Sequence, residues 1–415
     1  MTAADLDFEF ELAANPAAGP GAAPGSAPGA AYGPRQLAVL NPAGLAEARR
    51  AIALWPGYAP TPLVALPGLA RRLELGALHY KQEDARFGLR SFKPLGGAYA
   101  VLRCLKRVVA ERRGVAPSTA DMLSGRHAEI VRGVTVTAAT DGNHGRSVAW
   151  GARLFGCACV IYINEAVSAG RERAIAAFGA EVRRNPGSYD DAVRTAFAVA
   201  AAEGWHVIPD TTDGRVMEAP RDVMQGYAVM AAEAIEQLPP EAKPSHVFLQ
   251  AGVGGMAAAA CSEFWQAYGA ERPVTITVEP AQCACWFHSL KSGAPTAITG
   301  EVDSFMSGLA CGEVSSLAWE ILQPGAHFAM TLQDEAAACT MRLLAEAPFG
   351  DPPLVAGESG VAGLAGLIAL ARDTGARRRV GLDTDSRVVV FGTEGATDPE
   401  LYRRVVGRPA EQVAA

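Results

Sequence analysis

The sequence predicts an α/β protein with parallel sheets, and two observations carry this prediction. From about Val134 onward, short runs rich in β-branched residues alternate with longer, alanine-rich helical stretches. This alternation is typical of parallel strands joined by helices that cover both faces of a sheet. The length of 415 residues also exceeds one typical hydrophobic core, so we expect two domains or one large α/β unit.

The expected elements follow in chain order. Strands are expected where short apolar, β-branched runs occur, at residues 134–140, 157–164, 180–185, 205–210, 246–252, 274–280 and 387–395. Helices are expected over residues 146–156, 169–179, 190–203, 222–237 and from the glycines after 252 to about 268. Parallel sheets bind ligands at the carboxyl ends of their strands. Several glycine clusters fall at those ends, which predicts a ligand site there.

Charge and hydropathy argue against two classes of partner. The formal net charge is −7, from 37 basic and 44 acidic residues, and no long basic run occurs. A nucleic-acid or anionic-membrane partner requires a basic face, so we expect neither. No apolar run is long enough to span a bilayer, and the acidic N-terminus lacks the pattern of a signal peptide. We therefore expect a soluble, cytoplasmic protein.

The eight cysteines are scattered and form no paired metal-ligand set. Two C-x-C pairs occur, Cys157 with Cys159 and Cys283 with Cys285, but two short pairs without a histidine frame are weak as a zinc site. We expect reduced thiols and no metal.

The N-terminal segment differs in composition from the rest. Residues 14–34 are almost entirely alanine, glycine and proline. Such a stretch cannot bury enough apolar surface to offset the entropy lost on ordering. We expect a disordered tail over residues 1–35, with folding beginning near Gln36.

A glycine-rich turn follows the expected strand at 246–252, in the stretch "LQAGVGGMAAAA". Successive backbone N–H groups without a Cβ, next to the N-terminus of the helix that starts at Met256, form a concavity that suits a phosphate. A plain turn between strand and helix is the simplest alternative. A dinucleotide site is another, because the glycine spacing up to Ala257 and the acidic Glu279 after the next strand fit that fingerprint.

A second loop, "TDGNHG", joins the strand at 134–140 to a helix. Asn143 suits the role of a donor to a ring oxygen. Asp141 is either a helix N-cap or a general base, and His144 is either a site residue or a structural histidine.

The last expected strand ends in "FGTEGATD". Thr393 offers a neutral hydroxyl that can form a hydrogen bond with a ring nitrogen without protonating it, although alone it is an ordinary threonine at a strand end. Another glycine-framed loop, residues 356–360, carries Glu358 and Ser359, which could line a pocket.

Lys93 stands without other charges in "SFKPLGGAYA" (residues 91–100). A lysine with a pKa of about 10.4 is a poor nucleophile at neutral pH. Burial lowers that pKa, and imine formation with an aldehyde cofactor removes the ammonium altogether. A phosphate cradle, a donor to a ring oxygen, a partner for a ring nitrogen and a reactive lysine together indicate pyridoxal 5′-phosphate (PLP). A dinucleotide would leave Lys93 and Thr393 without a role.

On these motifs the sequence resembles the fold-type II PLP enzymes, the tryptophan synthase β-like family. The lysine segment, the asparagine loop and the phosphate loop occur in the family's order. Within that family the acidic residue at Asp141, "GLACGE" (308–313), "GESG" (357–360) and "TEGATDP" (393–399) are most similar to its ammonia-lyases. The resemblance covers roughly residues 36–405.

The resemblance implies the fold and the domains. It implies two parallel-sheet α/β domains with the active site between them, in a homodimer. The large domain is expected at residues 36–100 and 225–408, and the small domain at 101–224. Cys285 and Cys311 are expected in loops near the pocket as free thiols, with a regulatory disulfide as the alternative.

The resemblance also implies the residues that bind the cofactor. Lys93 would hold it covalently, Phe92 would pack near its ring, and Asn143 would donate to its phenolic oxygen. Thr393 would meet the pyridine nitrogen. The N–H groups on the phosphate would come from Gly252, Val253, Gly254, Gly255 and Met256.

The activity implied is α,β-elimination of 2,3-diaminopropionate to pyruvate and ammonia, within amino-acid catabolism. Lys93 would remove the α-proton of one enantiomer and Asp141 that of the other. Asp210 would bind the β-ammonium, or would only cap the following turn. The alternatives are a threonine or serine dehydratase, a biosynthetic lyase for another amino acid, and a non-catalytic protein that binds a dinucleotide or an amino acid.

Overall fold

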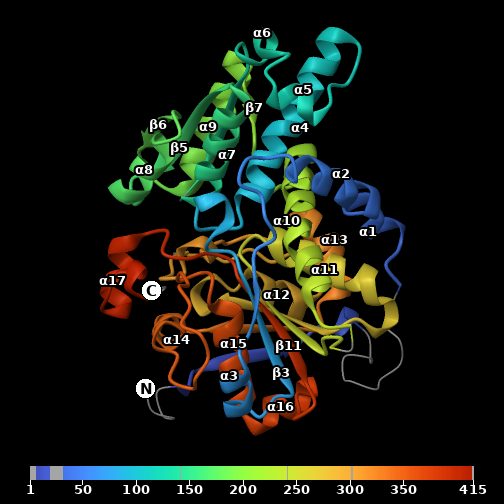
Figure 1. The fold of residues 1–415 in the computed structure, drawn as a ribbon, viewed down its shortest axis with the longest axis vertical. Helices are drawn as coiled ribbons and strands as arrows, with labels where there is room; N and C mark the ends of the chain where they lie inside the picture. The colour runs from blue at the N-terminus through green and yellow to red at the C-terminus, as the bar shows by residue number, and fades with distance from the viewer. Residues whose placement is uncertain (1–5, 19–30, 141, 241, 301, 414–415) are drawn as a thin grey trace. The chain divides into compact units, whose positions relative to one another are not determined.

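The structure is a computed structural model that describes residues 6–18, 31–140, 142–240, 242–300 and 302–413. Its contacts divide the chain into two compact units. The first unit contains residues 1–41, 60–90 and 230–415, and the second contains residues 42–59 and 91–229. Each unit has its own sheet (Figure 1).

The second unit is built on a four-stranded parallel sheet in the order β6-β5-β4-β7. Its strands are β4 (Thr135–Ala139), β5 (Ala158–Asn164), β6 (Glu181–Asn185) and β7 (His206–Val207). The helices that alternate with them are α7 (Asn143–Phe155), α8 (Ala169–Ala176) and α9 (Tyr189–Glu203). These strands and helices were predicted, although β7 is shorter than the expected 205–210. The further helices of this part of the chain are α2 (Pro42–Ile52), α4 (Pro94–Arg113), α5 (Thr119–Leu123), α6 (Ala128–Val131) and the first half of α10 (Glu218–Gln237).

Glycines let the helices of the second unit pack closely. A Cβ on Gly96 of α4 would overlap the ring of Tyr227 and lie 2.7 Å from the carbonyl oxygen of Val223, both on α10. A Cβ on Gly97 would overlap the Ser147 hydroxyl of α7. The glycine pair after Lys93 therefore serves the contacts of α4 with α7 and α10.

The first unit contains a seven-stranded sheet in the order β1-β10-β9-β8-β11-β3-β2. The strands from β10 to β3 are parallel, and the two edge strands are antiparallel to their neighbours. The strands are β1 (Phe10–Ala14), β2 (Leu63–Ala65), β3 (Ala77–Gln82), β8 (His246–Gln250), β9 (Val274–Pro280), β10 (Phe328–Leu332) and β11 (Arg387–Gly392). Of these, β8, β9 and β11 were predicted.

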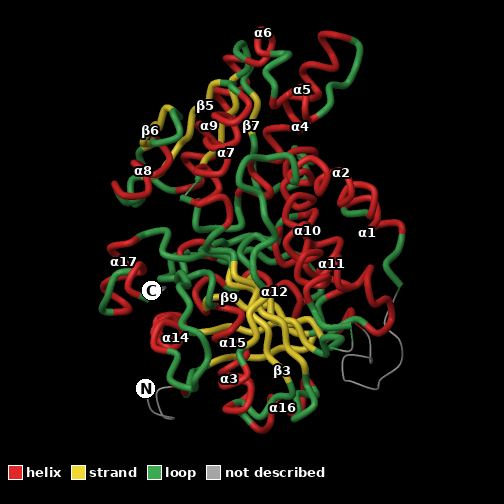
Figure 2. The backbone as a smooth tube through the Cα atoms, in the orientation of Figure 1, coloured by secondary structure: helices red, strands yellow, loops and turns green. Residues whose placement is uncertain are grey.

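Helices surround this sheet (Figure 2). They are α1 (Pro34–Val39), α3 (Pro67–Arg72), α11 (Gly255–Tyr268), α12 (Cys285–Ser292), α13 (Ser316–Gly325), α14 (Asp334–Glu346), α15 (Ala362–Arg372), α16 (Thr374–Val380) and α17 (Pro399–Val406). Helix α15 contacts β8, β9, β10 and β11, and all its residues except Arg372 are buried. Strands β8, β9 and β10 are buried along their whole length, as expected where both faces of a parallel sheet are covered.

The expectation of a disordered tail over residues 1–35 was wrong for part of that segment. Residues 10–14 form β1, which pairs with β10 from Phe10 opposite Leu332 to Ala14 opposite Phe328. Apolar residues alternate with acidic ones in "DFEFEL", a period that suits a strand with one buried face. This strand covers the edge of the sheet that β10 would otherwise leave open. Residues 19–30, in the middle of the alanine, glycine and proline segment, lie outside the described residues.

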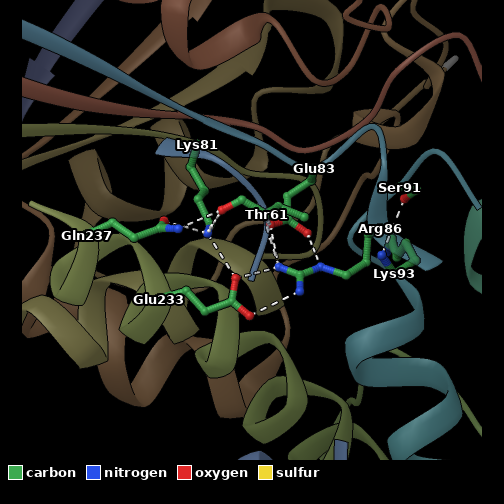
Figure 3. Close-up of polar contacts among 8 residues, drawn as sticks. All are labelled: Thr61, Lys81, Glu83, Arg86, Ser91, Lys93, Glu233 and Gln237. Carbon is green, nitrogen blue, oxygen red and sulfur yellow. Dashed lines mark hydrogen bonds and ion pairs between the residues drawn. The ribbon is translucent and has the colours of Figure 1, made fainter. Parts of the chain in front are cut away.

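A buried network of charges joins the region around β3 to the end of α10 in the first unit (Figure 3). The Arg86 guanidinium lies 2.7 Å from a carboxylate oxygen of Glu83 and 2.7 Å from one of Glu233. Lys81 lies 2.9 Å from Glu233, and the four charged side chains are at most 1% exposed. Thr61 and Gln237 complete the network through hydrogen bonds to these groups. Two cations and two carboxylates balance, which is the condition for burying charge.

Across the part of the chain that the structure describes, no helix is both long enough and apolar enough to cross a membrane.

Candidate active site

Lys93 lies at the N-cap of α4, directly before Pro94. Proline is tolerated at the first helical position because its missing N–H would have no partner within the helix. The Nζ atom lies 2.9 Å from Oδ2 of Asp210, which follows β7, and the two side chains are 20% and 17% exposed. The structure thus brings together two residues that lie 117 positions apart and that were both predicted as site residues.

The two partners change each other's pKa. Burial opposes the charge on Lys93, but Asp210 and Tyr227 together outweigh it and raise the pKa of the ammonium above its ordinary value. Burial likewise opposes the charge on Asp210, and the ammonium lowers the pKa of that carboxyl below its ordinary value. Lys93 is therefore an ammonium ion at neutral pH, and it must lose a proton before it can act as a nucleophile.

Two aromatic rings face the same ammonium. Nζ lies 5.5 Å from the ring centroid of Phe92 and 5.6 Å from that of Tyr227. The two rings contact each other with centroids 4.5 Å apart. Phe92 was predicted as a site residue. Tyr227 was missed, because a tyrosine inside a long apolar helix carries no signal that distinguishes it from a core residue.

His144 of α7 lies beside Asp210. Its Nε2 lies 2.7 Å from the carbonyl oxygen of Ile208, so that nitrogen must carry the proton of a neutral ring. Its Nδ1 then faces Oδ2 of Asp210 at 3.9 Å as a lone pair. Burial lowers the pKa of His144, which keeps the imidazole neutral. The histidine is thus buried and partnered, and it lies near the same carboxylate oxygen as Lys93.

The loop before α7 is organised by Thr140. Its hydroxyl accepts hydrogen bonds from the N–H groups of Gly142, at 3.0 Å, and of Gly145, at 3.1 Å. This turn places Asn143 as the first residue of α7. Asp141 lies outside the described residues, so its predicted role stays a prediction.

The predicted phosphate loop lies in the first unit, between β8 and α11. Gly254 has a φ of 99°, and a Cβ there would overlap the indole ring of Trp286. Trp286 also donates from Nε1 to the carbonyl oxygen of Gly252 at 3.0 Å. The N–H groups of the first turn of α11 are available to an anion because a helix has no partners for them. The glycine cradle therefore fits a phosphate group.

Glu279 argues against the dinucleotide alternative. It is fully buried, and its carboxylate accepts the backbone N–H groups of Trp286 at 2.9 Å and of Phe287 at 2.7 Å. Burial raises its pKa to about 8, and these hydrogen bonds act against that rise. A fully buried carboxyl group that caps a neighbouring helix in this way is not available to the hydroxyl groups of a ribose.

Thr393 directly follows β11, the strand next to β8 in the sheet, and is buried. Its Oγ1 accepts a hydrogen bond of 2.9 Å from Nε2 of Gln250, the last residue of β8. The threonine therefore lies at the same edge of the sheet as the phosphate loop. Gln250 was missed from the sequence, where it stands at the end of an apolar strand and carries no motif.

The glycine-framed loop at 357–360 is bound to the same edge. The Glu394 carboxylate accepts the N–H of Ser359 at 3.0 Å. The hydroxyl of Ser359 accepts the N–H of Gly308 at 2.9 Å, which ties this loop to residues 307–309. Glu358 and Ser359 are both buried. They fix the loop rather than projecting outward.

None of the eight cysteines, which all lie in the described ranges, forms a disulfide. The Cys285 thiol lies 3.5 Å from a Glu279 oxygen, and burial raises its pKa above the ordinary value. Cys285 and Cys311 are thus unbridged. Within the described ranges, no group of three or more histidine, cysteine or acidic side chains could hold a metal ion.

The fold and the predicted residues define a class of protein. The lysine amine beside aromatic rings in the second unit and the glycine cradle in the first unit each suit PLP, which needs an amine for its aldehyde and donors for its phosphate. The chain belongs to the pyridoxal-phosphate-dependent enzymes, whose family model matches residues 54–391.

Within this family the chain is similar to diaminopropionate ammonia-lyases. The protein of that name from Escherichia coli strain K12 is 39% identical over 365 residues, which cover 86% of this chain and 90% of the relative. The protein from Salmonella typhimurium strain LT2 is 37% identical over 366 residues, with the same coverage. The crystal structure of the Escherichia coli enzyme in complex with an aminoacrylate-PLP azomethine reaction intermediate matches with a TM-score of 0.84 at 34% identity, over 96% of this chain and 97% of that one.

Proposed function

We propose that this chain uses PLP to eliminate ammonia from 2,3-diaminopropionate, which yields pyruvate and ammonia. The observation that carries the proposal is the contact between Lys93 and Asp210, with 2.9 Å between Nζ and Oδ2. With its nitrogen bonded to PLP, Lys93 would no longer be a primary ammonium group, and the Asp210 carboxylate would be open to another cation. A substrate with a second ammonium group can replace that charge, whereas serine and threonine bring only a neutral hydroxyl.

The residues divide the work as follows. Bound PLP supplies the electron sink that stabilises the negative charge left on the α-carbon. As a free amine, Lys93 would take the α-proton on its own side, and Asp141 would take it from the opposite enantiomer. Asp210 binds the β-ammonium through Oδ2 and keeps it oriented until it leaves as ammonia. His144, as a neutral ring next to Asp210, leaves the negative charge of that carboxylate available to the substrate.

The remaining predicted residues hold the cofactor in this proposal. Phe92 packs near the ring, Asn143 donates to the phenolic oxygen and Thr393 meets the pyridine nitrogen. The phosphate is bound by the N–H groups of Gly252, Val253, Gly254, Gly255 and Met256. The glycine cradle and the buried Thr393 hydroxyl support these assignments. From the family resemblance we further propose a cytoplasmic location and a homodimer. Light scattering after gel filtration tests the homodimer.

The identity to two named diaminopropionate ammonia-lyases supports the choice of substrate. The experiment is pyruvate release from D- and L-diaminopropionate, D- and L-serine and L-threonine, measured side by side with PLP-loaded protein. We expect diaminopropionate to be turned over faster than any hydroxyamino acid. A preference for serine or threonine would show a dehydratase and refute the proposal.

A variant of Asp141 tests the stereochemical assignment. Asp141→Asn should slow turnover of one diaminopropionate enantiomer much more than that of the other, because Lys93 still serves one face. Equal losses for both enantiomers would remove the proposed role of Asp141. Asp213→Asn serves as the control, because Asp213 is 48% exposed and pairs with Arg215 at the surface.

A further inference from the structure

The Gln250 side chain has more hydrogen-bond acceptors around its nitrogen than that nitrogen has protons. Nε2 lies 2.7 Å from the carbonyl oxygen of Phe391, 3.2 Å from that of Gly360 and 2.9 Å from Oγ1 of Thr393. The residue is 3% exposed, so water does not compete for these contacts. The geometry therefore fixes which end of the amide faces Thr393.

The opposite orientation of the amide is excluded by the same contacts. If the side chain were flipped, Oε1 would face two backbone carbonyl oxygens, which can only accept hydrogen bonds. Nε2 must therefore point toward Phe391, Gly360 and Thr393. Two of these three acceptors are backbone groups that cannot move without moving β11 or the loop before α15.

The other end of the amide shows what this arrangement costs. Oε1 is buried and has no hydrogen-bond partner among the residues that the structure describes. Gly363 lies close to it, since a Cβ on that glycine would come within 2.9 Å of Oε1. An unsatisfied buried carbonyl oxygen destabilises the folded state, a cost that an apolar side chain of the same length would avoid. The contacts of the Gln250 donor end, including the one with Thr393, therefore offset this cost.

The hydrogen bond from Gln250 sets the direction of the Thr393 hydroxyl proton. Oγ1 of Thr393 accepts the hydrogen bond from Gln250, so the hydroxyl proton must point away from Nε2. Thr393 is thereby a donor toward whatever lies on its other side. A donor hydroxyl suits an unprotonated pyridine nitrogen and does not suit a protonated one, which needs an acceptor.

We propose that Gln250 is a positioning residue that makes the Thr393 hydroxyl a hydrogen-bond donor to the pyridine nitrogen of PLP and so keeps that nitrogen unprotonated. This inference rests on the proposed contact between Thr393 and the ring. It adds a residue of a neighbouring strand that sets the electronic state of the cofactor without touching it. A neutral ring withdraws electron density from the α-carbon less strongly. This favours prompt loss of the β-group over side reactions of a long-lived carbanion.

The test compares the affinity of the cofactor-free protein for two ligands, PLP and an analogue in which C–H replaces the ring nitrogen. Gln250→Met removes the donor while nearly keeping the volume. We expect it to weaken PLP binding about three- to tenfold, the range of one neutral hydrogen bond, and to leave binding of the analogue unchanged. Thr393→Val should show the same pattern, and the double variant should be no weaker than Thr393→Val alone.

Equal losses for both ligands would overturn the inference, because a structural effect of Gln250 does not depend on the ring nitrogen. Additive losses in the double variant would also overturn it. If the wild-type protein binds neither ligand, the proposed function itself fails, which is a distinct result. Gln250→Leu repeats the comparison if the methionine variant does not fold, and thermal unfolding of each variant identifies that case.

Discussion

The Lys93 ammonium and the Asp210 carboxylate form an ion pair of 2.9 Å in which neither side chain is more than 20% exposed. This pair joins the start of α4 to the segment after β7. Although burial alone would lower the pKa of Lys93, Asp210 together with Tyr227 raises it. In the proposed function Lys93 attacks the aldehyde of PLP and must first lose a proton, so the carboxylate would control the first step of cofactor loading.

Asp210→Asn should therefore speed cofactor loading near neutral pH. Without the carboxylate, burial dominates and the pKa of Lys93 falls, so a larger fraction of the amine is unprotonated. In wild-type protein the loading rate should rise with pH up to the alkaline end of the accessible range. In the variant this rise should begin at lower pH. Stopped-flow absorbance after mixing cofactor-free protein with PLP measures both profiles.

The same variant should lose turnover of diaminopropionate, because it no longer binds the β-ammonium. Faster loading with slower turnover separates the two roles of Asp210. Asp213→Asn is the matched control and should change neither rate. Identical loading profiles for wild type and Asp210→Asn would contradict the electrostatic account.

Glu233→Gln should strongly destabilise the first unit. Glu233 bonds to both Arg86 and Lys81 in the buried network, so the variant leaves two cations with one carboxylate (Figure 3). Breaking a buried pair costs about 3–5 kcal/mol. Glu411→Gln removes the partner of Arg90 in a pair that is 40% and 68% exposed, and should change stability by at most about 1 kcal/mol. Urea denaturation of both variants makes the comparison, and similar losses would refute the assigned weight of the network.

Gly96→Ala should destabilise the second unit although alanine favours helices. Its Cβ would overlap the Tyr227 ring and crowd the carbonyl oxygen of Val223, so α10 would have to move away from α4. Overpacking of this kind costs about 1–3 kcal/mol. Gly133→Ala is the control, because the nearest atom to its Cβ would be 3.5 Å away. A Gly96→Ala protein as stable as wild type would show that the helices do not pack as described.

Glu279→Gln should flatten part of the pH dependence of stability. Burial raises the pKa of Glu279 from an ordinary 4.5 to about 8. The folded protein thus retains a proton that the unfolded chain releases, so stability is lost as pH rises through this window and the loss ends near pH 8. The difference in unfolding free energy between wild type and variant should change with pH by up to about 1.4 kcal/mol per unit. Denaturation at pH 5, 6, 7 and 8 measures it, and a constant difference would contradict the shift.

The sequence predicted the parallel strands and their helices because alternating β-branched and alanine-rich segments have a clear period. It did not predict β10, a five-residue strand between two helices, or β1, which pairs with the edge of β10. The sequence also did not predict that Glu233 pairs with Lys81 and Arg86. Lys81 and Arg86 precede the lysine motif, but their partner Glu233 lies on α10, about 150 residues later.

The site was predicted where glycines and a lone lysine form local motifs. Residues that act through packing or orientation were not. Tyr227 lies in an apolar helix, and Gln250 is the last residue of a buried strand, so neither belongs to a local motif. Asp210 and Lys93 were each predicted as site residues, but their contact with each other could be identified only in three dimensions. Contacts over more than 100 residues leave no trace in a local pattern.

The central claim is that Lys93 is the residue to which PLP becomes attached. The most direct measurement is borohydride reduction of the PLP-loaded protein, followed by proteolysis and mass spectrometry of the labelled peptide. We expect one pyridoxyl group, located on Lys93. Lys93→Ala should lose the label, the yellow colour and pyruvate formation, whereas Lys291→Ala, which removes a surface lysine that also lies near a phenylalanine ring, should keep all three. A label on another lysine, or an unlabelled wild-type protein, would contradict the account.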